Sequence, residues 1–274
     1  MNIAVMMASR GAHASLQAVL KTSAALASGR HMISYVLGID HDDQVTQQAA
    51  ANVSHPPFSV QPGLGDKPSG MGELFNRLMN SSDADAYVHI TDRTHFLTPR
   101  WDVIVEQAVA KVPHGVFWLT HPDLPTSCIF PVITRRWLDA AGAVFTDYFP
   151  FWFDDTWLAE TWLFATGVAP MMLPVQAWRQ PHKTAKLRDL EFWYRFFFAL
   201  RPERMQVARD IARKLGLAAV NQDGIRRAME QSDAQLLARV PQIEAEYGMP
   251  GGEPDGGYLA AKARAEVMLQ KATG

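Results

Sequence analysis

The sequence contains a single cysteine, Cys128, among 274 residues. One thiol cannot form a disulfide within the chain, which excludes a disulfide-stabilised scaffold and favours a reducing compartment. Cys128 lies in the apolar segment 127–133, which predicts a strand, so we expect a buried and unreactive thiol. We therefore expect a cytoplasmic protein.

Long hydrophobic runs are also missing. The nearest candidate, Phe192–Leu200, is interrupted by Arg195 and is too short to span a bilayer. The apolar N-terminal segment Ile3–Ala8 is not preceded by basic residues and is followed directly by Arg10. It therefore predicts a first strand rather than a signal peptide, and we expect no transmembrane segment.

The chain also lacks a strong charge of either sign. It has 26 lysines and arginines against 28 aspartates and glutamates, a formal net charge of −2. No overall field draws such a protein to nucleic acid, and we expect no nucleic-acid partner. The glycine-rich segment 63–72 does not end in the Gly-Lys-Ser/Thr of a phosphate-binding loop. What is present is apolar material, 48 % of the residues, which is enough for a sizeable core.

Segments with strand character alternate with segments of helical spacing up to about residue 175. This alternation predicts an α/β fold with a mostly parallel sheet and helices on both faces. From residue 186 the sequence becomes helical and charged, so we expect a main domain over 1–185 and a helical C-terminal extension over 186–274. The expected strands are 3–8, 33–39, 58–60, 87–90, 116–119, 127–133 and 171–175. The expected helices are 44–52, 73–80, 135–141, 156–165, 187–200, 203–215, 221–238 and 258–272, besides a first helix that contains Leu16, Val19, Leu20 and Ser23 and ends at Gly29, and one that starts at Pro99–Asp102.

The most informative stretch is the short apolar strand Tyr87–Ile90, which is followed by Thr91, Asp92 and Arg93. In open α/β sheets, ligands bind beyond the carboxyl ends of the strands. Asp92 is therefore expected to contact a ribose or a metal ion, and the alternative is an ordinary turn in which the carboxylate bonds to nearby backbone.

Polar residues follow the first two strands as well. Ser9 and Arg10 come after the first strand, and Asp40 comes after the second. We expect Asp40 to bind a hydroxyl-rich ligand such as ribose by accepting hydrogen bonds, with loop solvation as the alternative. For Asp43, which stands directly before the next helix, we expect a helix cap.

A pair of carboxylates, Asp154 and Asp155, lies within the aromatic segment 149–157. Aromatic neighbours remove water from a carboxylate, which raises its pKa and its strength as a base. Either residue could instead cap the helix that we expect from Thr156. As the catalytic base, Asp155 is preferred to Asp154.

The order of these features resembles the GT-A fold glycosyltransferases, in particular the large inverting group called family two. The resemblance covers roughly residues 1–185. In that family, residues at the ends of the first two strands contact the nucleotide, an asparagine after the next loop lines the nucleotide pocket, and an Asp-x-Asp motif ends the middle strand. The corresponding positions in this sequence are Ala8, Ser9, Arg10, Asp40, Asn76, Thr91, Asp92 and Arg93.

The later family motifs also have counterparts here. An aromatic residue after a proline is matched by Trp101, the acidic pair that contains the catalytic base by Asp154 and Asp155, and a histidine near the metal or diphosphate by His182. The resemblance implies transfer of a sugar from a nucleotide-sugar, most commonly a UDP-sugar, with inversion. It also implies a divalent ion, Mn²⁺ or Mg²⁺, held by Asp92 and His182.

One position departs from the family pattern. Where the metal motif usually has its second acidic residue, this chain has Arg93. The side chain could form a surface ion pair with Asp92 or Asp83, or its guanidinium could offset the charge of the leaving diphosphate in place of a metal. We prefer the second interpretation.

Two other functions stay open: a sugar nucleotidyltransferase on a related fold, and a non-catalytic nucleotide-sugar-binding protein. The acceptor, whether glycan, lipid or protein, and a homo-oligomeric state are not specified by the sequence. The aromatic run Phe192–Phe198 is expected to pack the helical extension on the main domain, with a dimer face or a peripheral membrane contact as alternatives.

Overall fold

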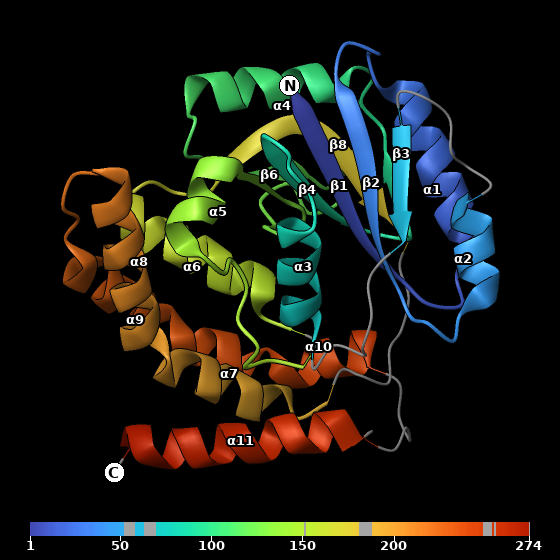
Figure 1. Ribbon diagram of the computed structural model, residues 1–274. Helices are drawn as coiled ribbons and strands as arrows, with labels where there is room; N and C mark the ends of the chain where they lie inside the picture. The colour runs from blue at the N-terminus through green and yellow to red at the C-terminus, as the bar shows by residue number, and fades with distance from the viewer. Residues whose placement is uncertain are drawn as a thin grey trace. The chain divides into compact units, whose positions relative to one another are not determined.

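The computed structural model describes most of the chain (Figure 1). The described residues are 1–51, 58–62, 70–150, 152–180, 188–248, 254 and 256–273.

The chain divides into two compact units. The first comprises Met1–Pro68, Gly72–Phe145 and Pro170–Gln180. The second comprises Ser69–Met71, Thr146–Ala169 and Pro181–Gly274, so it joins a segment from the middle of the sequence to the C-terminal helices. The division into a main domain over 1–185 and a helical extension over 186–274 stays a prediction.

The first unit is built on a mostly parallel sheet, as the alternation of strands and helices predicts. Its described strands are β1 (Asn2–Ser9), β2 (Met32–Ile39), β3 (Phe58–Pro62), β4 (Ala86–Thr91), β5 (Thr94–Phe96), β6 (Val116–Thr120), β7 (Pro131–Thr134) and β8 (Met171–Arg179). Their order in the eight-stranded sheet is β3-β2-β1-β4-β7-β6-β8-β5. Only β7 and β5 run antiparallel to their neighbours among these strands.

The helices of the first unit are α1 (His13–Leu26), α2 (Gln44–Ala51), α3 (Met71–Asn80), α4 (Trp101–Lys111) and α5 (Arg135–Ala141). Those of the second unit are α6 (Asp154–Thr166), α7 (Leu190–Ala199), α8 (Arg201–Leu215), α9 (Gln222–Ala238), α10 (Val240–Tyr247) and α11 (Gly256–Thr273). Among these described helices, none is both long and apolar enough to cross a bilayer.

Helices cover both faces of the sheet, and β4 shows how. Val88 and Ile90 point to the face packed by α1 and α4, where Leu16 and Trp101 are fully buried. On the opposite face, the ring of Tyr87 lies 5.1 Å from the Arg135 guanidinium of α5. A strand buried on both faces is mostly apolar, which is why the run at 87–90, apolar except for His89, predicted a central position.

Several element boundaries differ from those that the sequence predicted. β7 begins at Pro131, because a turn closed by a hydrogen bond from Ser127 N to Leu124 O precedes it. Cys128 is therefore half-buried outside a strand, and the expectation of a strand from 127 was wrong. The first helix ends at Leu26, before Gly29, whose φ of 75° belongs to the following turn. Helix α10, which starts at a proline-containing first turn, was not expected.

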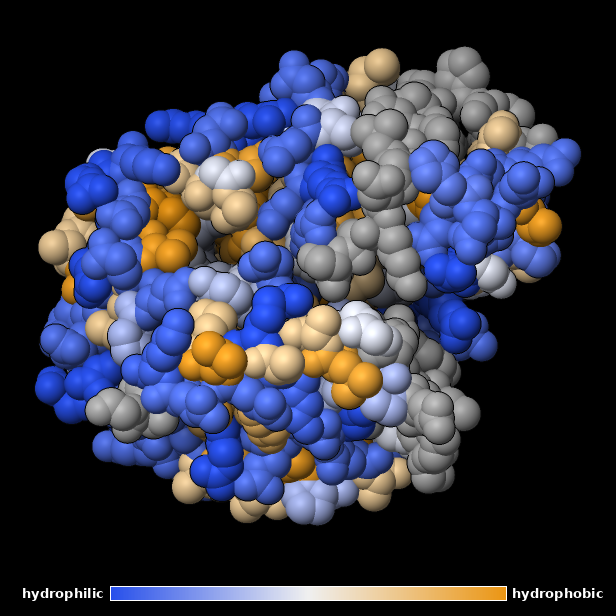
Figure 2. All heavy atoms as spheres, turned by 60° about the horizontal axis from the view of Figure 1, so that its bottom comes forward, coloured by the Kyte–Doolittle hydropathy of each residue, from blue (hydrophilic) through white to orange (hydrophobic). Residues whose placement is uncertain are grey.

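The second unit has an aromatic core of its own. Trp193, Phe196 and Phe197 of α7 are at most 2 % exposed, and they pack with Phe149 and Tyr258 of the same unit. The aromatic run at 192–198 therefore contributes interior side chains to this unit. The face shown in Figure 2 is mostly hydrophilic, and the hydrophobic patches visible on it are small and separate.

Candidate functional site

The carboxyl ends of β1 and β4 are joined by side-chain hydrogen bonds. Ala8 is in register with Thr91, and the buried Ser9 hydroxyl donates to Asp92 Oδ2 at 2.9 Å. The Ser15 hydroxyl, from the first turn of α1, donates to the Asp92 backbone oxygen at 2.6 Å. The structure thus brings together Ser9 and Asp92 as the sequence predicted. Ser15 was missed, since a serine in a helix carries no specific signal.

The ends of β1 and β2 are joined by an ion-pair cluster. Arg10 Nη1 donates to Asp40 Oδ2, and Arg10 Nη2 donates to Asp42 Oδ2 at 3.1 Å. The arginine side chain is 58 % exposed and that of Asp40 is 27 % exposed, so the pair is open to solvent and contributes little to stability. An open guanidinium beside a carboxylate can bind a ligand that carries both phosphate and hydroxyl groups.

Asp43 caps α2, as predicted. Its Oδ1 accepts the Thr46 N–H at 3.1 Å and its Oδ2 accepts the Gly11 N–H at 2.6 Å. These bonds, with the Gly11 bond first, hold the pKa of Asp43 below its usual value. Gly11 adopts a φ of 65°, which favours glycine, so the cap also fixes the loop after β1 next to Arg10.

The turn after β4 is held by threonines. Thr91 Oγ1 and Thr94 Oγ1 lie 2.8 Å apart, and the Arg93 N–H donates to Thr91 Oγ1 at 3.3 Å. The backbone oxygen of Arg93 accepts from Gln180 N at 3.1 Å, which ties the turn to the end of β8. Thr91, Asp92 and Arg93 are all half-buried, and the predicted motif lies in a hydrogen-bonded turn at the carboxyl end of β4.

The side chain of Asn76 is engaged by a loop of the same unit. Its Nδ2 donates to Phe145 O at 2.7 Å, and its Oδ1 accepts from Val144 N and Phe145 N at 3.0 and 3.1 Å. Asn76 therefore fixes Val144 and Phe145 in the loop that follows α5.

Trp101, which matches the family's aromatic position, is fully buried and donates from Nε1 to Ser23 O at 3.0 Å, so it is a core residue.

Asp154 and Asp155 belong to the second unit and are the first two residues of α6. The helix begins earlier than expected, and neither aspartate is its N-cap. That position is taken by Phe153, which has a φ of 77°. Arg100 and Asp189 enter α4 and α7 in the same left-handed conformation, so this geometry is a shared way of starting a helix and not a mark of the site.

The two carboxylates differ in their surroundings. Asp154 Oδ1 is buried and has no hydrogen-bond partner in the described part of the chain, and burial, aided by the charge of Asp155, raises the pKa of Asp154 well above its usual value. Asp155 is more accessible and accepts the Thr156 N–H at 2.7 Å. Paired carboxyl groups whose environments separate their pKa values can divide acid and base roles between them.

Replacing Asp154 with asparagine is expected to stabilise the protein at neutral pH. The folded form keeps a proton that the unfolded chain loses near pH 3.8. Stability therefore falls as pH rises from about 4 through the folded-state pKa. Urea unfolding at pH 4 and pH 7 should show the advantage of Asp154→Asn growing with pH. The exposed Asp147→Asn serves as control, and an advantage independent of pH would contradict the raised pKa.

The described residues do not form a metal site by themselves. Divalent ions need several oxygen ligands, and the described part of the chain has no group of three His, Cys, Asp or Glu side chains that could hold one. One oxygen of Asp92 already accepts from Ser9. A divalent ion 4 Å from the Arg93 guanidinium would be repelled by about 8 kcal/mol at an effective dielectric constant of 20. His182 lies outside the described residues, as does most of the glycine-rich segment 63–72.

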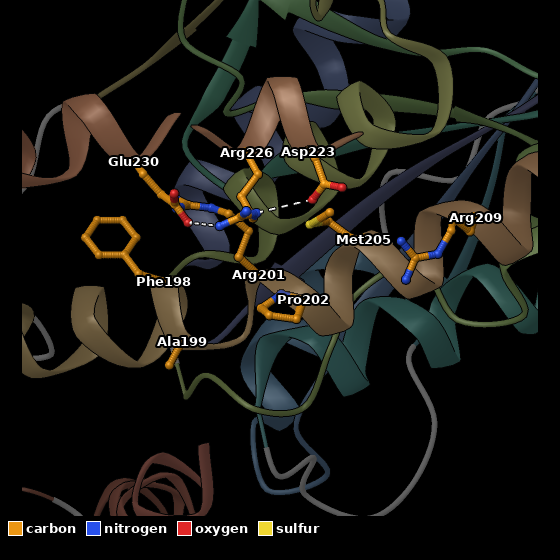
Figure 3. Close-up of a pocket in the computed structure, with 9 residues that line it drawn as sticks. All are labelled: Phe198, Ala199, Arg201, Pro202, Met205, Arg209, Asp223, Arg226 and Glu230. Atoms are coloured by element: carbon orange, nitrogen blue, oxygen red, sulfur yellow. Dashed lines mark hydrogen bonds and ion pairs between the residues drawn. The ribbon is translucent and has the colours of Figure 1, made fainter. Parts of the chain in front are cut away.

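A separate pocket of about 340 Å³ lies in the second unit (Figure 3). Figure 3 shows Arg226 between Asp223 and Glu230, and its guanidinium is 2.8 Å from Glu230 Oε1. Arg201, also in the lining, pairs with Asp233 at 2.9 Å. The lining residues are Phe198, Ala199, Arg201, Pro202, Met205, Arg209, Asp223, Arg226 and Glu230. None of them is a residue that the sequence predicted to bind or react.

Comparison with known proteins gives similarity in structure only. No family model and no curated protein matches the sequence. Among solved structures, the mannosyltransferase PcManGT from Pyrobaculum calidifontis, in complex with GDP-Man and Mn²⁺, has a TM-score of 0.56 at 12 % identity, over 99 % of this chain and 84 % of that chain. S. aureus TarS 1-349, in complex with UDP-GlcNAc, has a TM-score of 0.55 at 10 % identity, over 100 % and 82 %. In a longer TarS structure, the matched part is 49 % of that chain.

Glucosyl-3-phosphoglycerate synthase from Mycobacterium tuberculosis, in complex with Mn²⁺, UDP and glucosyl-3-phosphoglycerate, has a TM-score of 0.51 at 14 % identity, over 75 % of this chain and 80 % of that chain. At such identities the similarity establishes architecture and says nothing of individual site residues. The chain shares its architecture with these glycosyltransferases. This architecture includes the sheet order in which β7 and β5 run antiparallel to their neighbours, and it carries the polar residues at the strand ends. The chain has a GT-A-like fold.

Proposed function

We propose that the chain is a glycosyltransferase that binds a nucleotide-sugar at the carboxyl ends of β1, β2 and β4. The observation that supports this most is the convergence of polar side chains there: Ser9 bonds Asp92, and Arg10 pairs with Asp40. In a fold of this kind the strand-end crevice is the expected ligand site. A UDP-sugar is the preferred donor, and GDP-sugars are included because the similar structures contain both kinds of nucleotide.

Each of the predicted residues at the carboxyl ends of β1, β2 and β4 has a role in the proposed site. Asp40 accepts hydrogen bonds from the ribose or base, and Arg10 lies where it can approach the phosphates. Asp92, held by Ser9, contacts the ribose or the sugar, while Ala8 and Thr91 form the floor. Asn76 supports the site by fixing the loop at Val144 and Phe145.

The proposed reaction is a single displacement with inversion. The acceptor hydroxyl oxygen forms a bond to the anomeric carbon while the bond from that carbon to the diphosphate oxygen breaks. The electron pair of the broken bond stays with the nucleoside diphosphate, and the hydroxyl proton passes to Asp155, which belongs to the second unit. Asp154, whose pKa burial raises well above its usual value, keeps its proton to higher pH than an exposed aspartate does.

Replacing Asp40 with alanine is expected to weaken nucleoside diphosphate binding about 10- to 100-fold, because hydrogen bonds to a charged group contribute roughly 1.5–3 kcal/mol. Calorimetric titration with UDP and with GDP measures the effect. Asp42→Ala is the matched control, since Asp42 also pairs with Arg10 but is not expected to contact the nucleotide. Unchanged affinity in Asp40→Ala, or an equal loss in both variants, would place the nucleotide elsewhere.

A further inference from the structure

Two arginines are adjacent at the end of the β5–β8 pair in the first unit. Thr94 is the register partner of Arg179, and Gln180 N donates to Arg93 O at 3.1 Å. The Arg93 N–H is fixed in addition by Thr91 Oγ1. The backbones of Arg93 and Arg179 are therefore locked one step apart across a short ladder, next to the carboxyl end of β4.

The charges of these two arginines are not neutralised by the described part of the chain. Both residues are half-buried, and neither guanidinium has a hydrogen bond or an ion pair with a described residue. Arg135, another half-buried arginine of the same unit, pairs with Asp83 at 3.2 Å and donates to backbone oxygens. A cation partly removed from water without an anion is unfavourable, so two guanidinium groups that no described residue pairs indicate an anionic ligand.

The effect of Arg179 on His89 of β4 indicates where the Arg179 guanidinium lies. This histidine is half-buried, its buried Nδ1 has no hydrogen-bond partner among the described residues, and the centroid of its ring lies 3.7 Å from that of Phe75. Burial first, and then the positive charge of Arg179, lower the pKa of His89 to about 3. The Arg179 guanidinium is therefore near the face of β4 that carries His89, and the neutral histidine does not add to the local charge at physiological pH.

We infer that Arg93 and Arg179 form a two-arginine clamp for the diphosphate of the donor, an inference that rests on the proposed function. Guanidinium groups bind phosphate oxygens through a planar fork of donors, so two of them can match the charge of a diphosphate. When the bond to the anomeric carbon breaks, the charge gained by the leaving phosphate falls on oxygens that these donors already contact. The clamp neutralises the charge of the diphosphate. The described residues contain no cluster of ligands for a metal ion that could do so instead.

The test is calorimetric titration of the full chain with UDP and GDP in EDTA, with uridine and guanosine binding followed by ligand-observed NMR. Arg93→Met and Arg179→Met should each weaken diphosphate binding at least tenfold while changing nucleoside binding less than twofold. The control is Arg136→Met, an exposed arginine of α5. It follows β7, whose Thr134 pairs with Ala86 at the opposite end of β4, so its loss should leave both affinities unchanged.

The outcomes separate the clamp from the function on which it rests. Diphosphate binding that survives EDTA and falls in both arginine variants supports the clamp. Binding that requires Mn²⁺, or that neither variant weakens, overturns the clamp and leaves nucleotide binding intact. If neither UDP nor GDP binds, with or without Mn²⁺, the proposed function and the clamp are both wrong.

Discussion

Replacing Glu160 with glutamine is expected to lower the free energy of unfolding by about 3–5 kcal/mol, because it leaves a buried cation without its anion. Glu160 of α6 accepts from Arg204 Nε at 2.8 Å and lies 3.8 Å from Arg201 Nε. Arg204 is fully buried and Arg201 is 3 % exposed. Arg201 keeps a second partner, Asp233 of α9, whereas no other carboxylate is paired with Arg204 among the described residues.

The other donors of the Arg204 guanidinium show that Glu160 is its main charge partner. Its Nη1 donates to Phe197 O at 2.8 Å, while its buried Nη2 has no hydrogen-bond partner that the structure describes, and the guanidinium lies 3.8 Å from the Phe197 ring centroid. Burial lowers the pKa of Arg204 to about 10 and raises that of Glu160, although each partner opposes the shift of the other. Desolvation therefore exceeds the attraction between them, as is common for buried ion pairs.

A matched control is available in α7. Glu191 and Arg195 form an exposed pair one helical turn apart, at 2.7 Å, with side chains 61 % and 57 % exposed. Such pairs contribute roughly 0.3–0.5 kcal/mol, so Glu191→Gln should hardly change the urea midpoint. If Glu160→Gln and Glu191→Gln lose equal and small amounts of unfolding free energy, burial does not determine the contribution of the Glu160–Arg204 pair.

The double variant Glu160→Leu/Arg204→Met tests the reason for the loss. Removing both charges together leaves no unpaired ion, and apolar side chains of similar size suit the aromatic surroundings of Phe197 and Trp157. We expect the double variant to be more stable than either single variant. If it is the least stable of the three, the charges themselves stabilise the second unit.

The parts of the fold that the sequence predicted are those set by neighbouring residues. The run at 87–90 is apolar except for His89, so its central place in the sheet follows largely from composition. Leu16, Val19 and Leu20 lie on one face of a helix because of their spacing, and all three are buried. Asp43 caps α2 because its side chain needs only a backbone N–H three residues away.

The parts that were not predicted depend on residues far apart in the sequence. The strand expected to end at 175 continues to Arg179, because β5 pairs with it after an intervening stretch of more than 70 residues. Without that pairing nothing indicates that Arg179 lies beside Arg93. Likewise, the bond between Glu160 and Arg204 joins residues 44 positions apart, and each alone is an ordinary charged helical residue.

The start of α6 was mispredicted for a local but unusual reason. A helix entered through a left-handed residue normally has glycine or asparagine there, and Phe153 gives no such signal. The expected helix therefore began at Thr156, which left Asp154 and Asp155 as cap candidates. Their actual place in the first turn, where a helix favours negative charge, removes the capping explanation and leaves the chemical one to be tested.

Replacing Asp155 with asparagine is expected to reduce turnover about 100- to 10,000-fold, the range typical for loss of a general base. Asparagine keeps the size of the side chain, and its oxygen can still accept the Thr156 N–H that Asp155 Oδ1 accepts at 2.7 Å. The melting temperature should therefore change little. Release of UDP or GDP from the corresponding donor sugars, with water or a panel of glycan acceptors, gives the rate.

Asp154→Asn is the control for this experiment, because it removes the neighbouring carboxyl group with the same change of chemistry. If Asp155 is the base, nucleotide-sugar binding survives in Asp155→Asn and the rate constant falls, while Asp154→Asn retains measurable turnover. If the loss appears only in Asp154→Asn, the roles of the two aspartates are reversed. A wild-type chain that binds nucleotide-sugars but turns over no donor would instead identify a non-catalytic binder, in which the buried Asp154 and its accessible neighbour are a remnant of the catalytic pair.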